Sequence, residues 1–248
     1  MIFGVSPISG RFERKALLWL CTLGLFLLHA FSAGPLQASE VPCPPWDPLS
    51  QQQITQSAIP KELGRVLAYH KGNGLFAKFE EEKKVLLLQR PLKSSGELAF
   101  LPHRGMYRKL KTPFEQELLI TMTAVHERYH SGKVESMALR NVPLAMVLVE
   151  GFFTVFSGSW ESLTPHFQIY FASENQLWRL GLKPVHTVMQ QMISCIILEG
   201  EQERLVTLFI RETNGDVTRD QFLDPQILTP DQWGDYQRYF DWGMDTRP

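Results

Sequence analysis

The chain has 248 residues, of which 25 are basic and 26 acidic, so its formal net charge at pH 7 is −1. Proteins that bind nucleic acid usually carry a basic face, and this balance predicts no nucleic-acid partner. The same balance predicts no overall polybasic attraction to an anionic membrane surface.

The N-terminus has the residue order of a secretory signal. Three basic residues within positions 11–15 are followed by an apolar run at 16–31 and then by small residues that lead to Ala38. This order is typical of an exported protein, and the apolar run is short for a helix that spans a bilayer. We expect residues 1–38 to be a cleaved signal peptide and the mature protein to be periplasmic. An uncleaved inner-membrane anchor is the alternative.

The mature chain starts with a proline-rich lead-in at 39–49 and continues with a helical pattern. From residue 50 to residue 70 apolar side chains recur at spacings of three and four, and the glycines at 72 and 74 end this helix. The period then changes to two, and apolar runs alternate with turn signals, which favours an antiparallel meander. Strands are expected at 75–80, 85–88, 95–101, 106–110, 117–125 and 133–139.

An apolar segment interrupts the strands in the middle of the chain. Residues 143–156 are apolar on almost every side, and a second short helix is expected at 159–163, with Ser159 as its N-cap. Strand patterns then resume, and Asn214-Gly215 predicts the turn of a hairpin near the end of the chain.

Two boundaries divide the mature chain. Residues 50–225 carry the helical and strand patterns and are expected to form one domain, whereas residues 226–248 form an aromatic C-terminal helix and tail. The cysteines that remain after cleavage are Cys43 and Cys195, which an oxidising periplasm would allow to pair. The alternative, that Cys195 is a small buried core residue, stays open.

Residues 126–130 spell the H-E-x-x-H motif of zinc metalloproteases. That chemistry requires a helix, because histidines four residues apart then share a face. The preceding residues alternate as in a strand, where the two histidines would lie more than about 12 Å apart, since each residue advances about 3.3 Å. We therefore expect a polar strand end, with no metal, no cofactor and no catalytic residue. A zinc hydrolase built on His126, Glu127 and His130 is a remote alternative.

The apolar helix at 143–156 has two interpretations. It is either an ordinary core helix or a lid over the concave face of a curved sheet, and composition does not separate a filled core from an empty cavity. In the second interpretation, strands and lid line a site for acyl chains. The candidate lining residues are Phe76, Leu86, Leu88, Leu98, Phe100, Leu118, Ile120, Phe167, Ile169, Trp178 and Leu180 on the strands, and Met146, Val149, Phe152 and Phe153 on the helix.

Several segments resemble the LolA-related branch of the outer-membrane lipoprotein carriers. Residues 74–81 resemble the first-strand pattern of LolA-type carriers, and residues 87–100 contain a P-L-x-S-x-G-x-L-x-F run that precedes a proline. Residues 102–115 and the apolar helix that starts at 142 continue the match. The similarity covers about residues 60–225 and depends on order and spacing rather than on a catalytic signature.

The resemblance implies an α+β fold of the LolA/LolB type, in which a curved antiparallel β-sheet (a half-barrel) is covered by helices. It implies a periplasmic carrier, not an enzyme, that takes acylated lipoproteins from an inner-membrane donor to an outer-membrane acceptor. A glycolipid is the alternative cargo, and the expected state is a monomer. Typical LolA proteins hold the lid with an arginine before the strand-ending proline. Leu101 takes that place here, which leaves Arg104 and Arg108 as candidates.

A carrier must also release its cargo. Each buried methylene contributes about 0.8 kcal/mol, so a full acyl chain binds too tightly unless something offsets its burial. Displacement of a lid helix at 142–156 that already fills the site provides that offset. The rival interpretation is a non-catalytic exported β-protein that acts in a protein complex through its aromatic C-terminal helix, between Trp233 and Trp242.

Overall fold

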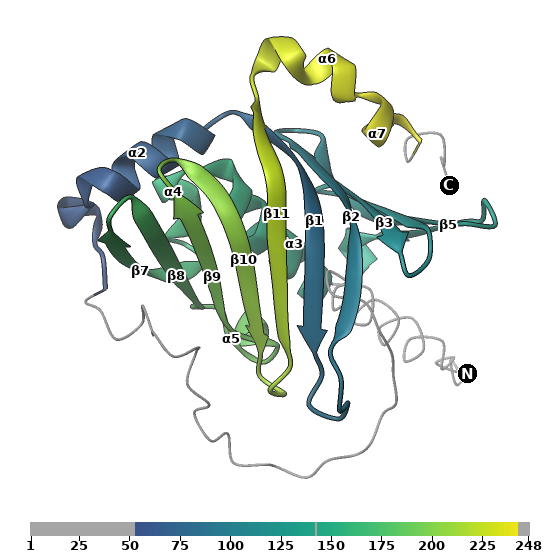
Figure 1. Ribbon diagram of the computed structural model, residues 1–248, viewed down its shortest axis with the longest axis horizontal. Helices are drawn as coiled ribbons and strands as arrows, with labels where there is room; N and C mark the ends of the chain where they lie inside the picture. The colour runs from purple at the N-terminus through teal and green to yellow at the C-terminus, as the bar shows by residue number, and fades with distance from the viewer. Residues whose placement is uncertain (1–52, 142, 243–248) are drawn as a thin grey trace, which may run out of the picture.

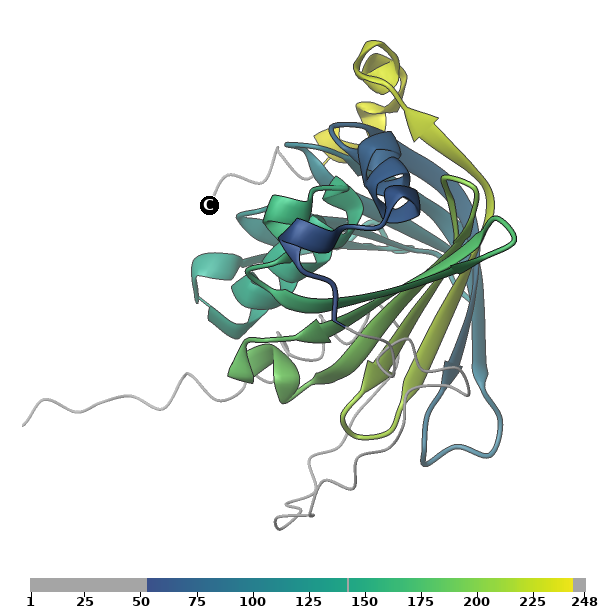
Figure 2. The ribbon, with the colours of Figure 1, turned by 90° about the vertical axis from the view of Figure 1, so that its left-hand side faces the viewer.

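Figure 1 shows the computed structural model of the chain, which describes residues 53–141 and 143–242. Eleven antiparallel strands form one open sheet in the order β6-β5-β4-β3-β2-β1-β11-β10-β9-β8-β7. The sheet is curved, and helices lie over its concave side (Figure 2). The predicted α+β class, a curved antiparallel sheet covered by helices, is confirmed. The predicted signal peptide at 1–38 and lead-in at 39–49 lie outside the described residues.

Consecutive strands pair in two meanders, as the alternating pattern predicted, and turns connect them except between β8 and β9. The first meander contains β1 (Gly74–Lys84), β2 (Leu92–Leu101), β3 (Gly105–Thr112), β4 (Gln116–Ile120), β5 (Ala124–Tyr129) and β6 (Val134–Ala138). The second contains β7 (Phe167–Glu174), β8 (Leu177–Pro184), β9 (Ile193–Glu201), β10 (Arg204–Glu212) and β11 (Val217–Leu228). The strand predicted at 85–88 is wrong, because these residues form the turn between β1 and β2.

Helices precede, separate and follow the meanders. Before β1 lie η3 (Gln56–Ala58) and α2 (Lys61–His70), and the predicted interruption at Pro60 separates them. Between β6 and β7 lie η4 (Leu139–Asn141), α3 (Pro143–Ser157) and α4 (Trp160–Leu163), and α5 (Thr187–Gln190) lies between β8 and β9. The chain ends with η5 (Pro230–Gln232), α6 (Trp233–Tyr236) and α7 (Arg238–Asp241).

The topology explains why α3 lies across the concave side. The first and last strands pair along their whole length, from Gly74 with Leu228 to Lys84 with Val217, so the two meanders join in the middle of the sheet. As a result β6 and β7, which are consecutive in the chain, form the two opposite edges. The connection between them must span the mouth of the half-barrel, and it consists of η4, α3 and α4 (Figure 2).

Alternation of side chains divides the sheet into two faces. On β1 the buried residues Leu75, Ala77 and Phe79 point to the concave face and into the main hydrophobic core. Helix α2 closes one end of this core with Leu63 and Val66, which are 0% and 5% exposed. The main core therefore lies between the concave face and the helices.

The C-terminal segment covers part of the convex face. Strand β11 passes the predicted boundary at 225 and ends at Leu228, after which Thr229 and Gln232 form a capping box. Helices α6 and α7 then fold back onto the sheet (Figure 1), where Phe240 is fully buried. The convex cluster joins Ala99, Leu101, Tyr107, Leu119, Leu228 and Phe240, with Phe76, Trp233, Tyr236, Tyr239 and Trp242 packed against it.

Cys195 lies on β9, in a small convex cluster with Ile197 and Phe209. It is fully buried, and it is disulfide-bonded. Its predicted partner, Cys43, lies outside the described residues. Among the helices of 53–141 and 143–242, none is both long enough and apolar enough to cross a membrane.

Candidate functional site

The concave face is largely apolar and spans both meanders. Eight of the predicted lining residues lie on this face and are buried in the main core. They form four pairs, and the two residues of each pair are two positions apart on one strand, so their side chains point to the same side. They are Leu98 and Phe100 on β2, Leu118 and Ile120 on β4, Phe167 and Ile169 on β7, and Trp178 and Leu180 on β8. The structure thus brings together residues up to 82 positions apart in the chain, from Leu98 to Leu180. That they bind a ligand remains a prediction.

Helix α3 packs into this concave surface with residues from Val147 to Phe156. Val149 and Phe156 are buried in the main core, and Phe153 is partly buried against it. The ring of Phe100 lies 5.8 Å from the ring of Phe153 and 5.6 Å from the ring of Phe156, measured between centroids. Met146, nearer the start of the helix, is 39% exposed, and the side chain of Phe152 is outside the described set.

Small residues let α3 approach its neighbours closely. A Cβ atom on Gly151 would lie 2.5 Å from Cε of Met189 in α5, and one on Gly158 would lie 2.7 Å from the Leu67 carbonyl oxygen in α2. The φ of Gly158 is 62°, a conformation that favours glycine. The chain just after α3 therefore lies close against the C-terminal end of α2.

Three predicted lining residues do not lie on the concave face. Phe76 is on the convex side of β1, where its ring lies 5.3 Å from that of Tyr236. Leu86 and Leu88 are in the β1–β2 turn and are 74% and 49% exposed. The predicted placement of these three residues is wrong, because Phe76 alternates with Leu75 and Ala77, and because the chain reverses at Leu86.

A buried charged cluster interrupts the apolar concave face towards the β1–β2 end. The guanidinium of Arg108 donates to Glu81 at 2.6 Å and to both carboxylate oxygens of Asp220 at 3.2 Å. It also lies 3.8 Å from the centroid of the Phe79 ring. These three charged side chains are 3–6% exposed, and Ser94 donates a further hydrogen bond to Glu81.

Burial governs the ionisation of this cluster. Desolvation raises the pKa of Asp220 to about 6, although Arg108 opposes the shift, and the carboxylate of Glu81 adds to it. The two carboxylates hold the guanidinium charged and raise the pKa of Arg108. Further along the same face, the ammonium of Lys83 donates to Glu212 at 2.8 Å, and Oε1 of Gln116 is buried without a hydrogen-bond partner in the described chain.

Of the two arginines that were candidates for holding the lid, Arg108 makes its contacts within the sheet. All the polar contacts of Arg108 are with Glu81 and Asp220 of the sheet, so the prediction for this residue is wrong. Arg104, in the β2–β3 turn, lies 4.0 Å from Asp241 of α7, on the C-terminal cover. What fixes α3 instead is apolar packing and its contacts with η4, α4 and α5.

The H-E-x-x-H segment lies at the end of strand β5, as predicted, and His130 begins the turn that follows. Nδ1 of His126 shares a 2.8 Å hydrogen bond with the hydroxyl of Ser136. The neighbouring Glu127 lies on the other face of the strand, where it accepts a hydrogen bond from the hydroxyl of Tyr129 at 2.5 Å. His130 is exposed and pairs with Glu115 at 3.3 Å. Within the described residues, no group of three or more His, Cys, Asp or Glu side chains could hold a metal ion.

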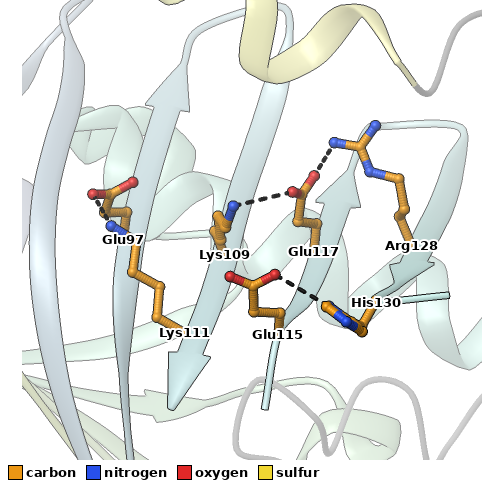
Figure 3. Close-up of polar contacts among 7 residues, drawn as sticks. All are labelled: Glu97, Lys109, Lys111, Glu115, Glu117, Arg128 and His130. Carbon is orange, nitrogen blue, oxygen red and sulfur yellow. Dashed lines mark hydrogen bonds and ion pairs between the residues drawn. The ribbon is translucent and has the colours of Figure 1, made fainter. Parts of the chain in front are cut away.

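The side chains around this segment form ion pairs across β2–β5 (Figure 3). Glu117 accepts from Lys109 at 3.5 Å and also pairs with Arg128, and Lys111 pairs with Glu97. The guanidinium of Arg128 in turn lies 4.5 Å from the centroid of the Trp242 ring. Through Arg128 and Trp242, this polar network contacts the C-terminal segment that covers part of the convex face.

Sequence reasoning missed the charged cluster, although the sequence contained a signal for it. Glu81 is in phase with Ala77 and Phe79, and Arg108 is in phase with Met106 and Leu110. A charged residue at a core position of a strand requires a buried partner. Which charges meet depends on strand order, and the pairing of β1 with β11 was not predictable.

The fold is an open, curved antiparallel sheet whose concave face is largely apolar and is covered by helices. Residues 64–223 match the family described as LolA-like outer membrane lipoprotein carrier proteins. The chain belongs to this LolA-like family, as the sequence resemblance predicted. No curated protein sequence matches the chain.

Solved structures with a similar arrangement have low sequence identity. A lipoprotein-sorting protein domain from Vibrio parahaemolyticus is 11% identical, with a TM-score of 0.39, over 71% of this chain and 95% of that one. A LolA superfamily protein from Nitrosomonas europaea is 10% identical, with a TM-score of 0.36, over 69% and 96%. MucB, in its complex with MucA from Pseudomonas aeruginosa, is 13% identical, with a TM-score of 0.38, over 68% and 58%.

Proposed function

We propose that the chain is a periplasmic carrier that binds the acyl chains of lipoproteins, or of a related acylated lipid, on its concave face and moves them towards the outer membrane. The observation that carries this proposal is the position of α3. An apolar helix crosses the open mouth of the sheet and covers an apolar face assembled from both meanders.

The proposed mechanism is an exchange between α3 and the cargo. The backbone hydrogen bonds of α3 lie within the helix, and its contact with the strands is made by side chains such as Phe153 and Phe156. The helix can therefore leave the sheet without breaking a strand ladder. An acyl chain that takes its place regains the apolar contacts, so the net affinity stays moderate.

The close contact just after α3 gives this exchange a direction. Gly158 leaves no room for a side chain between α3 and α2, whereas Met146, near the other end, is partly exposed. We propose that α3 swings about its C-terminal end and that its N-terminal half opens first. The carrier then needs no catalytic residue.

The polar end of the concave face suits the polar part of such a cargo. An acylated lipoprotein is amphiphilic, since its acyl chains are followed by a polypeptide. Apolar strands would hold the acyl chains. The free acceptor atom of Gln116 and the charges around Arg108 would lie near the polar linkage.

A displacement measurement tests the proposal. The purified protein is loaded with a fluorescent fatty acid and then titrated with a diacylated lipopeptide or with the same peptide lacking acyl groups. The proposal predicts that only the acylated peptide displaces the probe. Failure of the protein to take up the probe and the lipopeptide would contradict it.

A further inference from the structure

The turn between β1 and β2 exposes three consecutive leucines. Leu86, Leu87 and Leu88 are 74%, 92% and 49% exposed. The turn projects beyond the ends of the neighbouring strands (Figures 1 and 2). A contiguous apolar patch is unfavourable in water and marks a surface that another apolar surface covers.

The protein fixes the backbone of this turn. The amide of Leu88 donates to the Val85 carbonyl at 2.9 Å, which closes the turn. The amide of Leu86 donates to the carboxylate of Asp216 in the β10–β11 turn, also at 2.9 Å. The leucine side chains are therefore presented to solvent by an ordered backbone.

Further apolar side chains lie at the same end of the sheet. The hydroxyl of Thr213, in the β10–β11 turn, donates to the Gln191 carbonyl at 2.7 Å, which links that turn to the end of α5. Val185, just before α5, and Val188, within it, are 39% and 38% exposed. The exposed leucines and valines thus lie at the same end of the sheet.

Basic side chains surround the apolar tip. Lys84 and Lys93 flank the turn with side chains that are 72% and 76% exposed, and Arg90 lies within it. Both lysines approach the same carboxylate, that of Glu82, at 3.9 Å. Around the turn, the three cations Lys84, Arg90 and Lys93 outnumber the two carboxylates of Glu82 and Asp216. The tip therefore carries a local positive charge, although the net charge of the whole chain is −1.

We infer that the β1–β2 turn is a membrane-docking element for bilayers that contain anionic phospholipid. Leu86 and Leu87 enter the boundary between headgroups and acyl chains, and the surrounding cations meet the phosphates. The match between cations and lipid phosphates favours a bilayer over a protein as the occupant. This surface is separate from the concave face, so the inference does not depend on the proposed carrier function.

Cosedimentation with protein-free vesicles tests the inference. One set of vesicles contains phosphatidylethanolamine and phosphatidylglycerol, and the other contains phosphatidylcholine alone. The purified wild type is compared with a L86S/L87S variant and with Leu177→Ser as the matched control. Leu177, the first residue of β8, is 52% exposed and lies at the opposite end of the sheet.

We expect the wild type and the Leu177→Ser control to bind the anionic vesicles equally. The L86S/L87S variant should bind on the order of tenfold more weakly for each leucine removed. A K84Q/K93Q variant should lose roughly fivefold for each cation, and added salt should weaken wild-type binding. Because all these side chains are exposed, the thermal unfolding of each variant should match that of the wild type.

Two results would overturn the inference. One is a wild type that binds neither kind of vesicle, which would point to a protein as the occupant of the turn. The other is a L86S/L87S variant that binds as tightly as the Leu177→Ser control. Equal binding to both kinds of vesicle would overturn the role assigned to the cations.

Discussion

The ring of Phe153 in α3 meets the ring of Phe100 in β2 at an interplanar angle of 61°, with 5.8 Å between centroids. This contact joins the crossing helix to the concave face of the first meander. It occupies the surface that an acyl chain would need, so the helix and the cargo compete for the same contacts. The first prediction follows from that competition.

Phe153→Ala should raise the affinity for acylated cargo. The substitution weakens the closed position of α3, and a larger open fraction increases the apparent affinity of a ligand that binds only the open state. A loss of about 1 kcal/mol from the closed state corresponds to roughly a fivefold rise in affinity. Titration of a fatty-acid probe measures this change. An affinity that stays constant or falls would contradict the competition.

Phe240→Ala is the matched control on the convex face. Phe240, a residue of α7, is fully buried against the convex face, so its removal should lower the free energy of unfolding by about 3–5 kcal/mol. Affinity for acylated cargo should stay at the wild-type value, because the sheet separates the two faces. Urea denaturation and the same probe titration check both expectations. Unchanged stability would mean that the C-terminal cover contributes little to the fold.

Asp220→Asn should remove a pH dependence of stability. The folded-state pKa of Asp220, about 6, lies above the ordinary value of 3.8, so ionisation costs more in the folded state than in the unfolded state. The wild type should therefore lose stability as the pH rises from about 4 to about 6. The variant mimics the protonated group and should lack this loss. Urea denaturation of both proteins across that pH range measures the free energy of unfolding. Parallel pH profiles for the wild type and the variant would refute the prediction.

Arg108→Met should destabilise the protein strongly at neutral pH. It leaves Glu81 and Asp220 buried without their shared cation, which costs about 3–5 kcal/mol. Part of the loss should be recovered near pH 5, where Asp220 is protonated, and also in the R108M/D220N double variant. Unfolding measurements at both pH values test this. A variant as stable as the wild type at pH 7 would show that the pair is not important to the fold.

Much of the fold was predictable because local patterns were clear. The change of period after Gly74 marked the start of the sheet, and the apolar run from 143 marked α3. Pairs in phase, such as Leu98 with Phe100 and Phe167 with Ile169, identified the concave face correctly. Each of these inferences needs only the strand period and the burial of apolar side chains.

The errors have local causes as well. Phe76 shares its phase with Lys78 and Glu80, so the alternation on β1 already placed it opposite Phe79. The apolar run at 85–88 was predicted to be a strand, but β1 ends before it and the run forms an exposed turn. Propensity alone does not distinguish a buried strand from an exposed apolar turn.

Long-range pairing accounts for what could not be predicted. The Arg108–Asp220 contact joins residues 112 positions apart, and it depends on β11 pairing with β1. The aromatic residues from Trp233 onwards signalled a contact surface, but not that the surface is the convex face of the same sheet. In the structure these aromatic side chains pack against the convex cluster of the same chain.

Native mass spectrometry of the protein, purified from a periplasmic extract without detergent, tests the central claim most directly. The carrier account predicts a population with added mass that matches a lipid or an acylated peptide, and uptake of added diacylated lipopeptide by the bare protein. A bare protein mass with no uptake of the lipopeptide would contradict it.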